Sequence, residues 1–338
     1  MERDVQLDCY RALTMMYIVC VIHTSFWFYL DLHFDKTLLL IEMPVIFFIA
    51  GASQSFKKRC SLKETIINRS KRVLLPYYIF LCLLIVWFYA CTLLDVSFEG
   101  ETIDITQLNT ADIIKILATG GSEKIPYLGY TWFISCYMII SCSLPAQKAI
   151  MKRMPKMVYA AVCFFLFMVC YLLNIHAPEN IVENVLCYNF FYILGYVFYK
   201  QLKKKQIILA AILSVTISTI LFANGRIFQK FPPDIFFILY NLGAICILGI
   251  ILSHVKIPYN NIIKLWNVRG YNIFLYQSIS LFIVYKMTEH MRKYIQNDFV
   301  MFIILFFAAI TVATFISYFT FYIEKRIISL ICRNPKKK

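Results

Sequence analysis

The run PYYIFLCLLIVWFYACTLL at residues 76–94 contains no charged side chain and can cross the roughly 30 Å hydrocarbon core of a bilayer as one helix. Comparable apolar runs recur along the whole chain of 338 residues, of which 60% are hydrophobic. A soluble domain is nearer to about 45–50% apolar, so a surplus of this size cannot be buried in one soluble core. Transmembrane strands would produce only alternating segments of about ten residues. The sequence therefore predicts an all-α, polytopic membrane protein.

About ten transmembrane helices are expected, in a single integral-membrane domain that covers residues 1–338. Their approximate bounds are 12–30, 37–56, 76–95, 127–146, 157–175, 184–199, 207–223, 234–253, 271–288 and 299–323. With the N-terminus inside, 26 of the 34 lysine and arginine residues fall in segments on the inner face. This asymmetry follows the positive-inside rule. We therefore expect both termini in the cytoplasm and the protein in the cell (inner or plasma) membrane.

Two connecting segments differ from the other, shorter loops. Residues 57–75 contain seven positive charges and are expected to form a basic cytoplasmic loop. Residues 96–126 contain five acidic residues and are expected to form an acidic outer-face loop, with one amphipathic helix around Asp112 to Ala118. Because the sequence contains no soluble catalytic domain, the active site of an enzyme with this sequence would lie among the membrane helices and their inner loops.

Charge and cysteine content exclude several classes of partner. A net charge of +15 could indicate nucleic-acid binding, but the excess lies in the inner-face segments. We therefore expect contacts with membrane lipids and none with nucleic acid. The twelve cysteines are scattered singly, without a Cys-x-x-Cys pair, as in apolar helices rather than in a disulfide or zinc framework. Since no Walker loop and no metal-ligand spacing occurs, we expect no metal and no permanently bound cofactor.

His23 and Glu42 are ionisable side chains within the first two predicted helices, where such groups are costly and become functional candidates. A rise of about 1.5 Å per residue places His23 about 18 Å above Arg11, and Glu42 about 7–8 Å below the outer end of its helix. The two depths match. A carboxylate beside a histidine can fix its tautomer and make it a general base. The alternative is that His23 only forms hydrogen bonds within the bundle, while Glu42 sits at the interface.

Arg69 and Arg72 lie three residues apart in the basic loop and would share one face of a helix. Together they could hold one phosphate group. The alternative is a general attraction to lipid head groups. Trp132 opens the fourth predicted helix near the outer interface, where an aromatic belt is the ordinary explanation.

In these residues the chain resembles the acyltransferase 3 family of membrane O-acyltransferases. The family's Asp-x-x-Arg-Ala/Gly-Leu motif and first-helix histidine look like Asp8 to Leu13, followed by His23. Its Pro-x-Phe-Phe-x-x-Ser-Gly motif looks like Pro44 to Gly51, its Arg-x-x-Arg-x-x-x-Pro element like Arg69 to Pro76, and its Trp-Phe helix opening like Trp132-Phe133. The motifs cover nearly the whole chain in order. The length is similar to that of the ten-helix branch that O-acetylates surface polysaccharides such as enterobacterial common antigen.

Two positions depart from the family's pattern. Arg11 and His23 stand twelve steps apart, whereas the family usually has eleven, which keeps the two residues within about 20° of each other on a helix. Either a π-bulge absorbs the extra residue, or the two side chains do not share a face. The family's Tyr-Leu-x-His motif ends here on Gln277 instead, after Leu275 and Tyr276. A glutamine can form hydrogen bonds but cannot carry a proton at neutral pH.

The resemblance implies a membrane O-acyltransferase that moves an acetyl group from acetyl-CoA, its acyl-CoA donor substrate, to a hydroxyl of a cell-envelope saccharide or lipid-linked glycan. Two other classes stay open. A saccharide-lipid flippase or small-solute transporter would be expected to contain an internal repeat and broken helices. A non-catalytic relative of the family would be consistent with the two departures.

Under the acyltransferase hypothesis, each candidate residue has one role. His23 would deprotonate the acceptor hydroxyl, and Glu42 would orient it, a role that follows from depth rather than from the family. The phosphates of CoA would be held by three arginines: Arg11, Arg69 and Arg72. An acceptor site or pocket would include three residues: Trp132, Tyr276 and Gln277.

Overall fold

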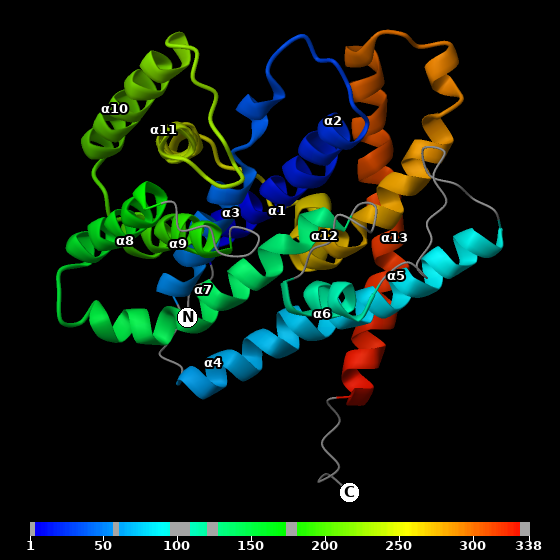
Figure 1. Cartoon of the computed structure of the whole chain (residues 1–338), viewed down its shortest axis with the longest axis horizontal. Helices are drawn as coiled ribbons and strands as arrows, with labels where there is room; N and C mark the ends of the chain where they lie inside the picture. The colour runs from blue at the N-terminus through cyan, green and yellow to red at the C-terminus, as the bar shows by residue number, and fades with distance from the viewer. Residues whose placement is uncertain (1–3, 57–60, 95–108, 120–127, 174–180, 332–338) are drawn as a thin grey trace, which may run out of the picture. The chain divides into compact units, whose positions relative to one another are not determined.

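The computed structural model describes residues 4–56, 61–94, 109–119, 128–173 and 181–331, and these residues are built into helices (Figure 1). The α-helices are α1 Val5–Tyr17, α2 His23–Trp27, α3 Glu42–Ser55, α4 Leu62–Arg69, α5 Leu75–Leu93, α6 Thr110–Thr119, α7 Phe133–Ile150, α8 Lys156–Leu172, α9 Ile181–Phe198, α10 Lys204–Ala223, α11 Ile235–His254, α12 Asn261–Thr288 and α13 Asp298–Ile331. The π-helices are η1 Ile18–Ile22 and η3 Ser70–Leu74, and the 3₁₀ helices are η2 Lys36–Leu39, η5 Gly129–Trp132 and η7 Met291–Lys293.

Eight helical segments of the described chain are long and apolar enough to cross a membrane. They are Val5–Trp27, Lys36–Ser55, Leu62–Leu93, Gly129–Ile150, Ile181–Phe198, Lys204–Ala223, Ile235–His254 and Asp298–Ile331. Of the other two expected spans, α8 is apolar but has only 17 residues, and α12 begins with a polar stretch that includes Lys264 and Arg269. The chain is thus an all-α, multi-pass membrane protein, as predicted. The count of ten spans and the cytoplasmic side of both termini stay predictions.

The segment expected as a basic loop is largely helical. α4 and η3 continue without a break into α5, so that residues 62–93 form one long helical rod (Figure 1). Charge keeps the first turns of such a rod out of hydrocarbon, but it does not stop them from being helical, because lysine and arginine are good helix formers. Residues 57–60 of the expected loop lie outside the described residues.

The expected acidic loop at 96–126 is described only at residues 109–119. Here α6 is present, in agreement with the amphipathic helix predicted around Asp112 to Ala118. The Tyr77 hydroxyl on α5 donates a hydrogen bond of 2.8 Å to the carbonyl of Ile116, so α6 is fixed to the side of α5.

Contacts divide the chain into two compact units, the first of residues 1–14, 35–62 and 139–264 and the second of residues 15–34, 63–138 and 265–338. In the first unit, α3 and α9 approach each other backbone to backbone. A Cβ placed on Gly51 would fall 1.8 Å from the carbonyl oxygen of Tyr192, and one placed on Gly195 would fall 1.9 Å from that of Phe48. Small residues permit such an approach between membrane helices. The glycine that ends the Pro44 to Gly51 motif is therefore explained by packing.

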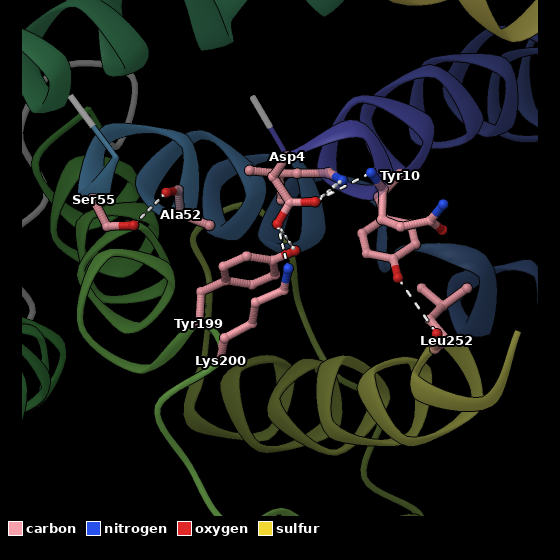
Figure 2. A network of polar contacts seen from close by, with 9 residues as sticks. Asp4, Tyr10, Ala52, Ser55, Tyr199, Lys200 and Leu252 are labelled. Atoms are coloured by element: carbon pink, nitrogen blue, oxygen red, sulfur yellow. Dashed lines mark hydrogen bonds and ion pairs between the residues drawn. The ribbon is translucent and has the colours of Figure 1, made fainter. Parts of the chain in front are cut away.

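Asp4 fixes the start of α1 within the first unit. Its carboxylate accepts hydrogen bonds from Lys200 Nζ at 2.6 Å and from the Tyr199 hydroxyl at 2.9 Å (Figure 2). Burial alone would raise the pKa of Asp4, but the hydrogen bonds from Lys200 and Tyr199 outweigh burial and hold the pKa below its usual value. Six residues further on, the Tyr10 hydroxyl donates to the carbonyl of Leu252 on α11 (Figure 2). The first turns of α1 are thus anchored to the ends of α9 and α11.

In the second unit, α12 passes through the apolar interior. Leu275 and Tyr276 belong to one buried cluster with Tyr77 and Phe80 of α5, together with side chains of α6 and α7. Two polar contacts hold α12 just before these residues: the Tyr271 hydroxyl donates to the carbonyl of Val73 in η3 at 2.9 Å, and Asn272 Nδ2 donates to Glu324 Oε2 of α13 at 2.6 Å. As a result, residues 275–278 of α12 lie within the packed interior of this unit.

Candidate active site

A π turn immediately precedes the candidate base. The backbone N–H of His23 donates to the carbonyl of Ile18, five residues earlier, and closes η1. A π turn takes in one residue more than a regular α-helical turn, and such turns are frequent at functional sites. It is the first of the two alternatives raised by the spacing of Arg11 and His23: the backbone absorbs the extra residue just before the histidine.

His23 is held by Gln277, its partner within the second unit. The Nδ1 atom of His23 lies 2.6 Å from Oε1 of Gln277, and the glutamine is completely buried. Because an amide oxygen can only accept, Nδ1 is the protonated nitrogen of the neutral ring. The lone pair is therefore on Nε2, which is the nitrogen that can take a proton from a substrate.

Two aromatic rings enclose the imidazole. Trp27, one helical turn after His23, stacks on the ring with centroids 4.5 Å apart and planes inclined by 16°. Tyr130 of η5 lies 5.8 Å away on a tilted plane, and its hydroxyl donates to the carbonyl of Leu275 at 2.5 Å. Tyr130 is buried, whereas His23 is half-buried. The ring of His23 is thus restrained in its plane by Trp27 and along its edge by Gln277.

Sequence reasoning missed Trp27 and Tyr130. A signal was available for Trp27, because residues four apart are neighbours on a helix. Tyr130 stands two residues before Trp132, and the aromatic-belt explanation of Trp132 gave no reason to expect a contact between Tyr130 and His23. Trp132 itself is half-buried in η5.

Glu42, predicted to orient His23, has a different partner within the first unit. Its Oε1 forms an ion pair with Lys230, and both side chains are mostly buried, at 3% and 13% exposure. Its Oε2 is buried without a hydrogen-bond partner among the described residues. Lys230 lies in the connection between α10 and α11 and was not identified from the sequence. Glu42 and His23 belong to different units, and their pairing stays a prediction.

The three candidate phosphate-binding arginines lie in two environments. Arg11, in the first unit, donates to Ser53 Oγ at 2.6 Å and to Asp8 Oδ1 at 3.4 Å, so the first and fourth residues of the Asp8 to Leu13 motif are paired. In the second unit, Arg69 donates to the Tyr137 hydroxyl at 2.9 Å, with its guanidinium carbon 5.6 Å from the ring centre. Arg72 is exposed on η3.

Tyr276 and Gln277 are both buried but have different neighbours. Tyr276 packs edge-on against Phe80 at 5.2 Å, and its hydroxyl has no hydrogen-bond partner in the described part of the chain. Successive helix residues point about 100° apart, so Tyr276 faces α5 while Gln277 faces His23. The geometry thus joins Gln277, not Tyr276, to the candidate base. Within the described ranges, no group of three or more His, Cys, Asp or Glu side chains could hold a metal ion.

Comparison with known proteins shows the family to which the chain belongs. The family model described as an acyltransferase domain, acyltransferase 3, matches residues 4–322. No curated protein and no solved structure matches the chain. The matched range covers nearly the whole chain. It includes the π turn, His23, Gln277 and all three candidate arginines. The protein is a membrane acyltransferase and belongs to the acyltransferase 3 family.

Proposed function

We propose that this membrane acyltransferase transfers an acetyl group from acetyl-CoA to a hydroxyl of a cell-envelope saccharide or lipid-linked glycan. The observation that carries the proposal is the 2.6 Å contact between His23 Nδ1 and Gln277 Oε1. It leaves Nε2 as the basic nitrogen of a half-buried ring, which is the form that a general base requires. The resemblance to polysaccharide O-acetyltransferases supports a sugar hydroxyl as the acceptor.

In the proposed step, His23 Nε2 takes the proton of the acceptor hydroxyl while the hydroxyl oxygen attacks the thioester carbonyl. The C–S bond then breaks, the ester forms, and the sulfur of CoA receives the proton from Nε2. The imidazolium that forms in between keeps its Nδ1–H on Gln277, so the ring keeps its orientation throughout. No covalent acyl-enzyme is needed.

The donor would be held through its phosphates by Arg69 and Arg72, which both belong to the second unit, while a part for Arg11 stays a prediction. A guanidinium carries several N–H donors in a planar fork that suits phosphate oxygens, so the single bond from Arg69 to Tyr137 leaves donors for a ligand. Tyr137 would then set the direction of the Arg69 guanidinium. Trp132 is proposed to line the acceptor side, whereas Tyr276 faces α5 and packs against Phe80.

The test is acetyl transfer from radiolabelled acetyl-CoA to surface glycans in membranes that contain wild type, His23→Ala or His290→Ala. His290 is exposed and provides the matched control. We expect His23→Ala to lower transfer by about 100-fold or more, the usual contribution of a general base, and His290→Ala to have no effect. Equal labelling with His23→Ala would remove His23 from the mechanism. Absence of labelling with wild type would contradict acetyl-CoA as the donor.

Glu42→Gln belongs in the same experiment, because it tests the predicted orienting role of Glu42 separately. If the carboxylate supports His23, transfer falls while the amount of protein in the membrane is unchanged. If Glu42 serves only its ion pair with Lys230, Glu42→Gln and Lys230→Met will have the same effect. Each variant will then lower both acetyl transfer and the amount of protein in the membrane.

A further inference from the structure

We infer that the basic end of α12 binds a phosphate group through Arg269 and Trp266. None of the roles proposed above involves these two side chains. Where the phosphate belongs to CoA, this inference rests on the proposed function. Where it belongs to a membrane lipid, the inference stands without it.

Arg269 is a cation whose charge is not balanced by a carboxylate among the described residues. Its guanidinium carbon lies 4.1 Å from the ring centre of Tyr318 and 5.2 Å from that of Phe321, both on α13. These contacts direct the guanidinium and partly remove it from water. Its Nη1 atom is buried and has no hydrogen-bond partner in the described chain. A charge with a buried, unused donor is unfavourable unless an anion completes it.

Trp266 supplies a second unused donor one helical turn earlier. Its side chain is completely buried, and its Nε1–H has no hydrogen-bond partner among the residues described. Residues three apart lie on neighbouring parts of a helix face, so the two donors come from the same side of α12. Buried tryptophan N–H groups usually find an acceptor. Two such donors, a turn apart and both unused, indicate an acceptor with more than one oxygen.

The buried acidic group of α13 already has a partner. Glu324 accepts a hydrogen bond of 2.6 Å from Asn272 Nδ2, and the Asn272 Oδ1 in turn accepts from the Thr320 hydroxyl at 2.9 Å. The buried acid of α13 is therefore satisfied by the amide one turn above Arg269. This arrangement leaves the arginine for a ligand from outside the chain.

The surroundings favour phosphate over other anions. The Tyr271 hydroxyl donates to the Val73 carbonyl, which brings this part of α12 against η3, where Lys71 and Arg72 are exposed. Arg269 also stands just before the predicted span 271–288, at the depth where lipid phosphates and the phosphates of a cytoplasmic donor are found. An arginine fork presents parallel N–H groups to phosphate oxygens, and the indole N–H adds a third direction.

The experiment measures binding of two probes to the purified full-length protein in nanodiscs. CoA is compared with 3′-dephospho-CoA, and phosphatidylglycerol is compared with phosphatidylcholine. The variants are Arg269→Gln and Trp266→Phe, which keeps the bulk of the ring and removes its N–H. Lys264→Gln is the matched control, because Lys264 is an exposed cation on the same helix.

If CoA is the source, both variants weaken CoA binding about tenfold or more and Lys264→Gln does not. If a lipid is the source, CoA binding is unchanged and both variants lose the preference for phosphatidylglycerol. The inference is overturned if neither probe responds to either variant. Should Arg269→Gln reduce the amount of folded protein, Trp266→Phe decides by itself. Failure of the wild-type protein to bind CoA would contradict acetyl-CoA as the donor. The comparison of the two lipids would still show whether Arg269 and Trp266 bind a phosphate group.

Discussion

At the scale of single residues, the group that binds His23 Nδ1 determines which nitrogen of the ring can accept a proton. In this chain that group is Gln277, which stands where the family's motif has a histidine. A glutamine cannot take up the proton, but its amide oxygen accepts from Nδ1–H at every pH at which the protein is folded. The orientation of His23 is therefore independent of a second titrating group.

Gln277→Leu removes this acceptor while keeping a side chain of similar size. We expect acetyl transfer to fall by about 10- to 100-fold, because the ring loses its preferred tautomer and orientation. Gln277→Glu restores an acceptor and should recover most of the activity. The added negative charge favours the imidazolium, so the acidic limb of the pH–rate profile should move to higher pH. Wild-type activity and an unchanged profile in both variants would mean that Gln277 does not position His23.

The sequence identified these residues without identifying their contacts. His23 stands out because an ionisable side chain is rare inside an apolar helix, and Gln277 stands out as a departure from a motif. Their hydrogen bond joins residues 254 positions apart, which no helical periodicity can relate. The partner of Glu42 was likewise predicted only from helix depth, because periodicity cannot relate residues on separate helices. The sequence around Lys230 contains no pattern that marks it as the partner of a carboxylate on α3.

At the scale of helices, two glycines determine how closely α3 and α9 can pack. Phe48 and Tyr192 each place a backbone carbonyl where the other helix would carry a side chain. Such close packing makes dispersion contacts between backbones, which stabilise membrane helices in place of the hydrophobic effect. Ser53, two residues after Gly51 on the same helix, accepts a hydrogen bond from Arg11 of α1.

Gly51→Ala should therefore disrupt the first unit, since its new methyl group would lie 1.8 Å from the Tyr192 carbonyl. The helices must separate, at an expected cost of about 1–3 kcal/mol or more, the usual effect of overpacking. Gly249→Ala on α11 is the matched control, because a Cβ there meets nothing within 4 Å. Thermal unfolding of the purified variants measures both. A melting temperature of Gly51→Ala as high as that of Gly249→Ala would contradict the close packing of α3 and α9.

Helix boundaries were harder to predict than helices. The apolar run at 76–94 identifies a membrane span, but the helix that contains it begins at Leu62. Hydropathy indicates whether a segment lies in lipid or in water, and it does not indicate where the helical backbone conformation begins. The π turn at Ile18–Ile22 was one of two alternatives, since an extra residue between two motif positions shows only that some irregularity is needed. The π-helical hydrogen bond of the folded backbone distinguishes the two alternatives.

At the scale of the whole molecule, composition predicted the class of protein, while the division into units was not predictable. Each unit is assembled from three separate stretches of the chain, and α1 passes from one unit to the other between Thr14 and Met15. No linker, charge run or change of composition marks that position. The division follows from which helices pack together, a property of the folded chain and not of any local segment.

The orientation in the membrane can be tested on a single hairpin. α10 has 20 residues, enough to cover about 30 Å at the helical rise, and it separates Lys205 from Arg226. Both side chains are exposed. If lysine and arginine set the orientation, Lys205 faces the cytoplasm and Arg226 the outside. A membrane-impermeant maleimide should then label Arg226→Cys in intact cells, and Lys205→Cys only after the cells are opened, above the background of the native cysteines. The opposite pattern would invert the topology, and it would place the basic end of α12 and the arginines proposed to hold CoA on the face that cytoplasmic acetyl-CoA cannot reach.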